Sequence, residues 1–218
     1  MSPLDSLTPA ERARQLANPD GAIGLAIAAY LNDHNKTGNA ATVALLAIQP
    51  GNAVLEIGFG NGRTAAEVLR QADGVRYTGI DHSATMVAEA SRFNADMADR
   101  ASFHLAAADR MPFTGASFDR VFSIGVIHFW TDPVASLKEV RRVMRPGATM
   151  IMGCLSPRGA SGIHQPAFGF HLRDPETWEA LTRAAGFTQA RAEERPIDHT
   201  APDGSLSRRY LIRLTGSA

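Results

Sequence analysis

The chain has 218 residues, of which 44% are hydrophobic and 20% are charged, a balance typical of one globular domain with a sizeable core. Its 22 basic residues offset its 22 acidic ones, so the formal net charge is zero and the composition predicts no nucleic-acid partner. The single cysteine, Cys154, excludes an internal disulfide, and no apolar run approaches the roughly 18 residues of a membrane span, so we expect a soluble, cytoplasmic protein without a membrane partner.

The first 48 residues are predicted to form helices only. TPAE at 8–11 supplies a capping residue, a first-turn proline and a capping-box glutamate, and NPDG at 18–21 ends the helix that starts there. Apolar residues at helical spacing predict a second helix around 23–30 and a third around 40–46. The stretch 28–41, AAYLNDHNKTGNAA, is polar for a packing helix, which leaves an exposed face or a ligand contact as its role.

From residue 49 onward, short apolar runs alternate with helical periods. Strands are predicted near 53–57, 75–80, 102–105, 119–124, 148–154, 189–194 and 207–214. Helices are predicted near 62–72, 83–97, 133–144 and 174–186. This alternation is typical of parallel β-α-β units, so we expect an α/β fold with a doubly wound, mostly parallel, seven-stranded sheet. Residues 49–218 would form one compact domain beside the helical segment 1–48.

The segment 156–173, SPRGASGIHQPAFGFHLR, interrupts this alternation. It is rich in glycine and proline and carries His164, Phe168, Phe170 and His171. A long irregular segment in a compact domain is typically a functional loop. Because it follows the fifth strand, we expect it at the edge of the sheet where ligands bind.

Three glycines, Gly58, Gly60 and Gly62, follow the first predicted strand in VLEIGFGNGRT, 54–64. Without Cβ atoms they permit a tight turn and a close approach by a ligand, and the helix N-terminus behind them offers N–H groups to an anion. A dinucleotide cofactor calls for G-x-G-x-x-G, but the sixth position here is Arg63. The spacing therefore counts against a nicotinamide-dependent oxidoreductase, which we keep as an alternative.

Four stretches in order resemble the class I S-adenosylmethionine-dependent methyltransferases, over roughly residues 50–190. They are VLEIGFGNGRT, TGIDHS at 78–83, FDRVFSIGVIHFWTDP at 118–133 and EVRRVMRPGATMIM at 139–152. The resemblance implies a Rossmann-like fold, an enzyme, and S-adenosylmethionine as cofactor with S-adenosylhomocysteine as product. It also implies that segment 1–48 is a lid over the cofactor, in which Tyr30, Asn35 and Lys36 are candidate contacts.

The same resemblance assigns residues to the cofactor. Glu56 and the glycine turn would hold the methionine end, Asp81 would accept from the ribose hydroxyls, and Met86 would pack on the adenine or ribose. Where the family commonly has an aspartate for the adenine amino group, this chain has Ala107, which leaves Asp109 or the backbone N–H of Ala108. The implied cofactor-binding set is Glu56, Gly58, Phe59, Gly60, Gly62, Asp81, His82, Met86, Ala108, Asp109, Ser123 and Gly125.

SIGVIHFW at 123–130 would lie at the methyl-donor edge. It lacks the motifs by which nucleic-acid, arginine and metal-dependent catechol methyltransferases are known, which leaves metal-independent methylation of a small molecule. His128 is the candidate general base because imidazole titrates near neutrality, and His164 and His171 are further candidates. Aromatic side chains suited to an aromatic or heterocyclic acceptor are Tyr30, Phe129, Trp130, Phe168 and Phe170.

Several questions stay open at this stage. The acceptor atom could be N, O, C or S, and the protein could be a monomer or a homodimer. Ala107 favours a further alternative, a module that binds S-adenosylmethionine without catalysis, because it removes an adenine contact.

Overall fold

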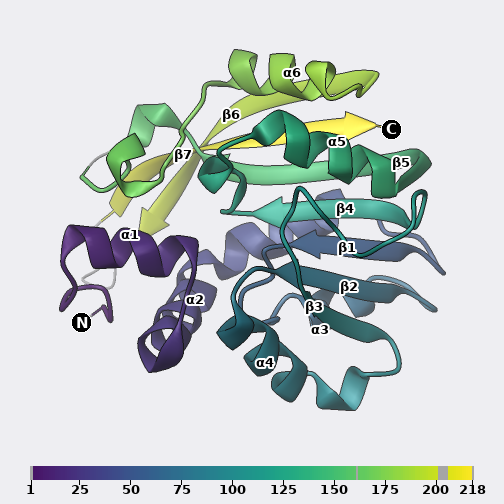
Figure 1. The fold of residues 1–218 in the computed structure, drawn as a ribbon, viewed down its shortest axis with the longest axis horizontal. Coiled ribbons are helices and arrows are strands. Elements are labelled where there is room, and N and C mark those ends of the chain that lie inside the picture. Colours follow the sequence, from purple (N-terminus) through teal and green to yellow (C-terminus); the bar gives the residue numbers. More distant parts are fainter. Residues whose placement is uncertain (1, 161, 201–205, 218) are drawn as a thin grey trace.

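The computed structural model describes residues 2–160, 162–200 and 206–217, and strands alternate with helices after an all-helical start (Figure 1). The strands are β1 (Ala53–Ile57), β2 (Arg76–Asp81), β3 (Ala101–Leu105), β4 (Phe118–Ile124), β5 (Met144–Leu155), β6 (Gln189–Thr200) and β7 (Leu206–Ser217). The helices are α1 (Pro9–Ala17), α2 (Gly21–Leu45), α3 (Ala65–Leu69), α4 (Ala84–Phe93), α5 (Pro133–Val143) and α6 (Pro175–Ala184).

The seven strands form one sheet in the order β3-β2-β1-β4-β5-β7-β6. Strands β1 to β5 pair in parallel, whereas β7 runs antiparallel to both β5 and β6. The predicted α/β fold with a mostly parallel, doubly wound sheet is confirmed. The chain reverses its direction of winding between β1 and β4, so these strands flank the point where such sheets bind ligands.

The helical start differs from the prediction in one respect. The capping box of α1 is confirmed, since the Thr8 side chain accepts from the Glu11 N–H and the Glu11 carboxylate accepts from the Thr8 N–H. The two further helices expected around 23–30 and 40–46 are instead one helix, α2, of 25 residues. The polar stretch contains no proline, and α2 contacts α1, α3, α4 and β5, which offsets the roughly 1 kcal/mol that the interior Gly38 costs.

The turn between α1 and α2 is attached to the start of α4. The Ser83 hydroxyl donates to the Pro19 carbonyl, and the Thr85 hydroxyl donates to the Asp20 carboxylate at 3.0 Å. Ser83 also caps α4 by accepting from the Met86 N–H at 3.2 Å. These bonds hold the helical start against the C-terminal end of β2.

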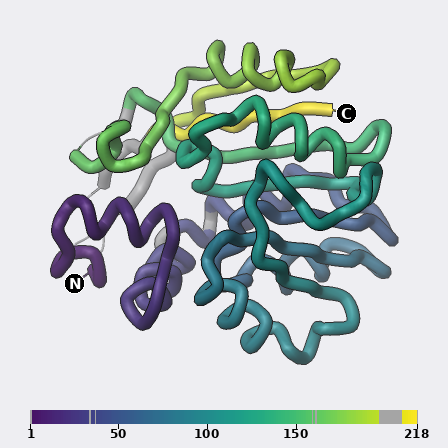
Figure 2. The backbone as a smooth tube through the Cα atoms, in the orientation of Figure 1, coloured from purple at the N-terminus to yellow at the C-terminus, as the bar shows by residue number. Residues whose placement is uncertain are grey.

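The helix expected at 62–72 is shorter than predicted, because Gly62 has φ of +74° and α3 begins only at Ala65. The segment 156–173 follows β5 as predicted and lies on the same side of the molecule as α1 (Figure 2). Its turn Pro166–Phe168 contacts α1.

Apolar side chains fill both faces of the sheet. One cluster lies between the sheet and helices α5 and α6 and includes the fully buried Trp178 and Leu137. The other face is covered by α3 and the end of α2, where Tyr77 and Phe122 are fully buried. Full burial of such a side chain stabilises a fold by about 1.5–3 kcal/mol. Cys154 is buried, and none of the helices in the described part of the chain has the length and apolar character of a membrane span.

Candidate functional site

A cavity of about 180 Å³ opens at the C-terminal ends of β1, β2 and β4. Helices α1 and α2 form one wall, and the glycine turn with the loop after β4 forms the other. Its lining comprises Leu16, Ala17, Pro19, Ile27, Ala28, Leu31, Asn32, Asn35, Asn39, Glu56, Gly58, Phe59, Gly60, Asn61, Arg63, Thr64, Asp81, His82, Ile124, Gly125, Val126 and Phe129. The site therefore joins the helical start to the point where the sheet reverses.

Gly58 and Gly60 of the glycine turn both have positive φ, but the space beside each Cα is different. Gly58 has φ of +73°, and a Cβ there would lie 2.3 Å from a Val126 methyl group, so the turn packs against the loop after β4. Gly60 has φ of +58°, and a Cβ there would meet no atom within 4 Å. Because Gly60 lines the cavity, that open space is available to a ligand.

Glu56, at the end of β1, is buried at the bottom of this arrangement. The hydroxyls of Tyr77 and Thr64 both donate to its Oε2 atom, the former at 2.6 Å. Burial raises the pKa of Glu56 to about 7, although the two hydroxyls act in the opposite direction and the nearby Asp81 adds to the increase. Glu56 is therefore a carboxylate that changes charge near neutral pH.

Asp81 ends β2, and its two oxygens connect neighbouring elements. One accepts from the Gly60 N–H at 3.0 Å and the other from the Ser83 N–H at 2.9 Å. Burial raises the pKa of Asp81, and these backbone donors limit the increase. Each carboxylate oxygen can accept more than one hydrogen bond, so Asp81 can still receive hydroxyl donors from a ligand.

Arg63 is the one Lys or Arg side chain in this lining, and it is engaged elsewhere. Its guanidinium lies 3.3 Å from the centre of the Phe93 ring and 3.8 Å from the Glu89 carboxylate. The carboxylates of Glu56 and Asp81 therefore face the cavity without an arginine partner. This charge distribution favours a ligand that brings its own positive group and hydroxyl donors.

Helix α2 faces the cavity with three amides, Asn32, Asn35 and Asn39. The Asn32 amide donates to the Asn61 side chain of the glycine turn at 2.8 Å, and Asn39 Oδ1 is buried without a partner. Of these, sequence reasoning named only Asn35. The spacing of three, four and seven residues, which puts side chains on one face of a helix, was the available signal for the other two.

The structure brings part of the predicted set to the cavity. Residues of the implied cofactor and substrate sets that line it are Glu56, Gly58, Phe59, Gly60, Asp81, His82, Gly125 and Phe129. Residues of those sets that do not line it are Gly62, Met86, Ala108, Asp109, Ser123, Tyr30, Trp130, Phe168 and Phe170. Lys36, another predicted lid contact, does not line it either.

Several residues outside the cavity lining have other contacts. Met86 is fully buried in a cluster that includes Phe59, rather than exposed to a ligand. The Ser123 hydroxyl donates to the Ile57 carbonyl of the neighbouring strand at 2.8 Å. Trp130 belongs to the core against α5 and α6, and Asp109 is exposed.

The three candidate catalytic histidines lie close to one another through Phe170 and the His128 backbone, but they do not line the cavity. His128 is 3% exposed, and its ring stacks on Phe170 at 5.5 Å with an interplanar angle of 6°. His164 meets the edge of Phe170 at 5.1 Å, and the His171 N–H donates to the His128 carbonyl at 2.7 Å. Burial, with a smaller effect of His164, lowers the pKa of His128 to about 3, and its Nδ1 atom is buried without a partner.

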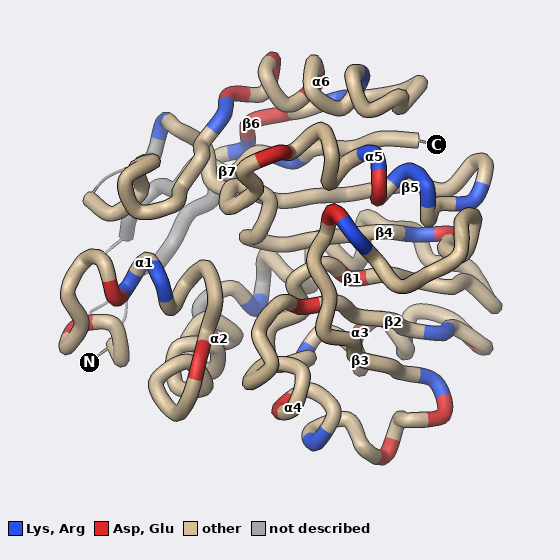
Figure 3. The backbone as a smooth tube through the Cα atoms, in the orientation of Figure 1, with Lys and Arg blue, Asp and Glu red and all other residues tan. Residues whose placement is uncertain are grey.

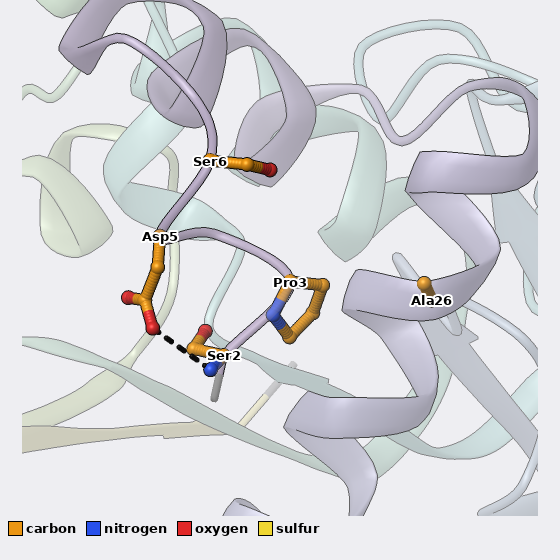
Figure 4. A pocket seen from close by; sticks show the side chains of 5 residues that line it. All are labelled: Ser2, Pro3, Asp5, Ser6 and Ala26. Carbon is orange, nitrogen blue, oxygen red and sulfur yellow. Dashed lines mark hydrogen bonds between the residues drawn. The ribbon is translucent and has the colours of Figure 1, made fainter.

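A second hollow, of about 450 Å³, lies at the N-terminal end (Figure 4). It is lined by Ser2, Pro3, Asp5, Ser6 and Ala26. Its one charged residue, Asp5, already accepts from the Ser2 N–H at 2.9 Å. The hollow offers no convergent set of polar groups, and we assign no site to it.

The family model described as a methyltransferase domain matches residues 55–152. The chain is 33% identical over 133 residues to 27-O-demethylrifamycin SV methyltransferase of Amycolatopsis mediterranei, covering 57% of this chain and 48% of that protein. It is 36% identical over 134 residues to demethylmenaquinone methyltransferase of Beutenbergia cavernae, covering 61% of this chain and 52% of that protein. The chain thus spans about half the length of these relatives.

Solved structures share the fold. Phosphoethanolamine N-methyltransferase 2 of Haemonchus contortus, in complex with S-adenosyl-L-methionine, superimposes with a TM-score of 0.69 at 17% identity, covering 83% of this chain and 52% of that one. A chain of the complex between the Haloferax volcanii Trm112 methyltransferase activator and a methyltransferase gives a TM-score of 0.71 at 20% identity, covering 88% and 93%. With the sheet order and the glycine turn, these findings show that residues 55–152 match the class I S-adenosylmethionine-dependent methyltransferase family.

Proposed function

We propose that this protein transfers a methyl group from S-adenosylmethionine to a small molecule. The observation that carries the proposal is the cavity at the reversal point of the sheet, where Glu56, Gly60 and Asp81 meet. When bound, S-adenosylmethionine supplies an electrophilic methyl group on a sulfonium. The residues suit its chemistry: Glu56 would accept from the ammonium group, Asp81 from the ribose hydroxyls, and the space beside Gly60 would admit the amino-acid end.

The protein's own part in the reaction is to place the acceptor and to exclude water. The apolar side chains of Ile124, Val126 and Phe129 line the cavity next to the glycine turn. In-line placement in a water-poor site provides most of the rate enhancement that such a transfer requires. We propose a transfer that needs no general base from His128, since a buried imidazole with a pKa of about 3 is a weak proton acceptor.

Two observations support a small acceptor with aromatic or heterocyclic character. The names of the two relatives give small-molecule acceptors, demethylrifamycin SV and demethylmenaquinone. The Phe129 ring lines the cavity, and its centroid lies 4.7 Å from that of Phe170 and 4.4 Å from that of His128, so a buried aromatic cluster holds this ring at the cavity wall. We further propose that α1 and α2 serve as a lid, because both line the cavity.

Titration calorimetry with S-adenosylhomocysteine tests the proposal, with NADH as the control ligand. We expect micromolar binding of S-adenosylhomocysteine and no binding of NADH. Binding of NADH alone would contradict the proposal. Binding of S-adenosylhomocysteine without methylation of any phenol, quinol or heterocycle in a broad acceptor panel would favour a non-catalytic binding module.

A further inference from the structure

Two hydroxyl groups donate hydrogen bonds to the same carboxylate oxygen of Glu56. Tyr77, near the start of β2, and Thr64, at the end of the glycine turn, both donate to Oε2. No hydrogen bond joins Oε1 to another described residue, and Glu56, although only 3% exposed, lines the cavity. The two carboxylate oxygens therefore have different surroundings.

Tyr77 has no other evident task that requires its hydroxyl. Its ring is 1% exposed and packs in the cluster formed by β1, β2 and α3, which a phenylalanine would fill equally well. The family resemblance assigns no role to this position. A buried hydroxyl that donates to a buried acid stabilises the ionised form of that acid.

We infer that Tyr77 is a positioning residue for cofactor binding: with Thr64 it holds Oε2 of Glu56, so that Oε1 receives the ammonium group of the cofactor. This inference rests on the proposed function. It assigns to Tyr77 an effect on the charge of Glu56 and not only on its orientation.

The inference predicts that binding is coupled to a proton. Free Glu56 has a pKa of about 7, and an ammonium group binds the ionised form better, so a proton leaves the carboxyl group and passes to the buffer when the ligand binds. The titratable and charged residues that face Glu56 or share its cavity are Tyr77, Asp81, His82 and Arg63. Helix α2, on the opposite wall, contributes the uncharged Asn32, Asn35 and Asn39.

The experiment measures the affinity for S-adenosylhomocysteine between about pH 6 and pH 8 by titration calorimetry. For the wild type we expect affinity to rise with pH up to about 7 and then to level off. Tyr77→Phe and Thr64→Val should move this midpoint upward by about one pH unit, because each removes a hydrogen bond that favours the carboxylate. Near pH 7 the ionised fraction of Glu56 falls from about one half to about one tenth, so the affinity should fall by about fivefold, with recovery at higher pH.

Two controls separate this effect from a loss of packing. Tyr210→Phe removes a hydroxyl from β7, outside the cavity lining, and should keep the wild-type midpoint. 5′-Methylthioadenosine lacks the amino-acid end, so its affinity should not follow the Glu56 titration in any variant. Titrations near pH 7 in buffers of different ionisation enthalpy should show more protons released by Tyr77→Phe than by the wild type.

Each other outcome is decisive. If Tyr77→Phe and Thr64→Val bind S-adenosylhomocysteine with the wild-type midpoint, the positioning role is wrong while the cofactor assignment stands. A matching pH dependence for 5′-methylthioadenosine would likewise overturn it, because the ammonium group would not be involved. If the wild type binds S-adenosylhomocysteine at no pH, the proposed function fails together with the inference.

Discussion

Gly58 and Gly60 lie two residues apart and should respond differently to the same substitution. In Gly58→Ala, the methyl group would meet Val126 at 2.3 Å with φ of +73°, which we expect to cost roughly 2–4 kcal/mol of unfolding free energy. In Gly60→Ala the methyl group enters open space, so the cost should be only about 1 kcal/mol from the positive φ. Urea denaturation measures both.

Ligand binding should reverse this order. Gly60→Ala fills part of the cavity, so it should weaken S-adenosylhomocysteine binding by about tenfold or more, equivalent to about 1.4 kcal/mol, while remaining folded. If Gly60→Ala bound the ligand like the wild type, the amino-acid end would have to lie elsewhere.

Asp81 connects the glycine turn to α4 and also faces the cavity. Asp81→Ala should weaken S-adenosylhomocysteine binding by about 1.5–3 kcal/mol, the contribution of a hydrogen bond to a charged group. It should also lower the free energy of unfolding, since the Gly60 and Ser83 N–H groups lose their acceptor. Calorimetry with a parallel urea titration distinguishes the two effects, and an unchanged affinity would contradict the ribose assignment.

Asp109→Ala is the matched comparison. Asp109 is exposed and does not line the cavity, so we expect unchanged affinity. A loss comparable to that of Asp81→Ala would return Asp109 to adenine recognition.

A residue's place at the site can be predicted from the sequence when the direction of its strand alone determines that place. Glu56, Gly60 and Asp81 end or follow adjacent parallel strands, so chain direction alone brings them together. Met86 and Ser123 also lie near the C-terminal ends of these strands. However, the Met86 side chain packs in a cluster with Phe59, and the Ser123 hydroxyl donates to the Ile57 carbonyl. Which neighbour a side chain contacts depends on how helices and strands pack together, and a sequence pattern carries no information on that packing.

At the scale of elements, α2 shows the same limit. Its apolar residues Ile27 and Val43 lie in the predicted helical segments, and both are buried. Its amides had two interpretations, solvent or ligand, and only the docking of α2 over the glycine turn places Asn32, Asn35 and Asn39 at the cavity. Periodicity identifies a face of a helix but not what that face meets.

Helix α2 should control entry to the cavity. The volume of about 180 Å³ is below the roughly 300–1,000 Å³ of sites for drug-sized ligands, so a wall must move when a nucleoside-sized cofactor binds. Asn32→Ala removes the 2.8 Å bond to Asn61 that ties α2 to the glycine turn. We expect association and dissociation of S-adenosylhomocysteine each to accelerate by about fivefold, the equivalent of a 1 kcal/mol hydrogen bond. Stopped-flow fluorescence measures both rates.

The neighbouring Asp33 provides the control for this change. Asp33 is exposed on the same helix and outside the cavity lining, so Asp33→Ala should leave both rates unchanged. An unchanged association rate in Asn32→Ala would mean that α2 does not limit entry.

At the scale of the whole molecule, acidic and basic residues are interspersed along the chain (Figure 3). With a formal net charge of zero, the pH dependence of stability therefore depends on a few buried groups more than on net charge. Glu56 and His128 are two such groups, and burial shifts their pKa values in opposite directions. His128, with its pKa lowered to about 3, contributes stability that is present above about 6.5 and is lost as the pH falls.

Glu56 should act in the other direction. Its pKa of about 7 lies above the ordinary value of 4.5, so the folded state binds the proton more tightly than the unfolded chain. The stability it contributes is complete below about pH 4.5 and is lost as the pH rises through 7, a change of about 3 kcal/mol over 2.5 pH units.

Glu56→Gln stays neutral and keeps an acceptor for Tyr77 and Thr64. Urea denaturation should therefore find both proteins similarly stable near pH 4.5 and the variant more stable by about 3 kcal/mol near pH 8. A difference that stays constant between these pH values would show that Glu56 is not held in a desolvated site, and the proton-coupled binding inferred for Tyr77 would lose its basis.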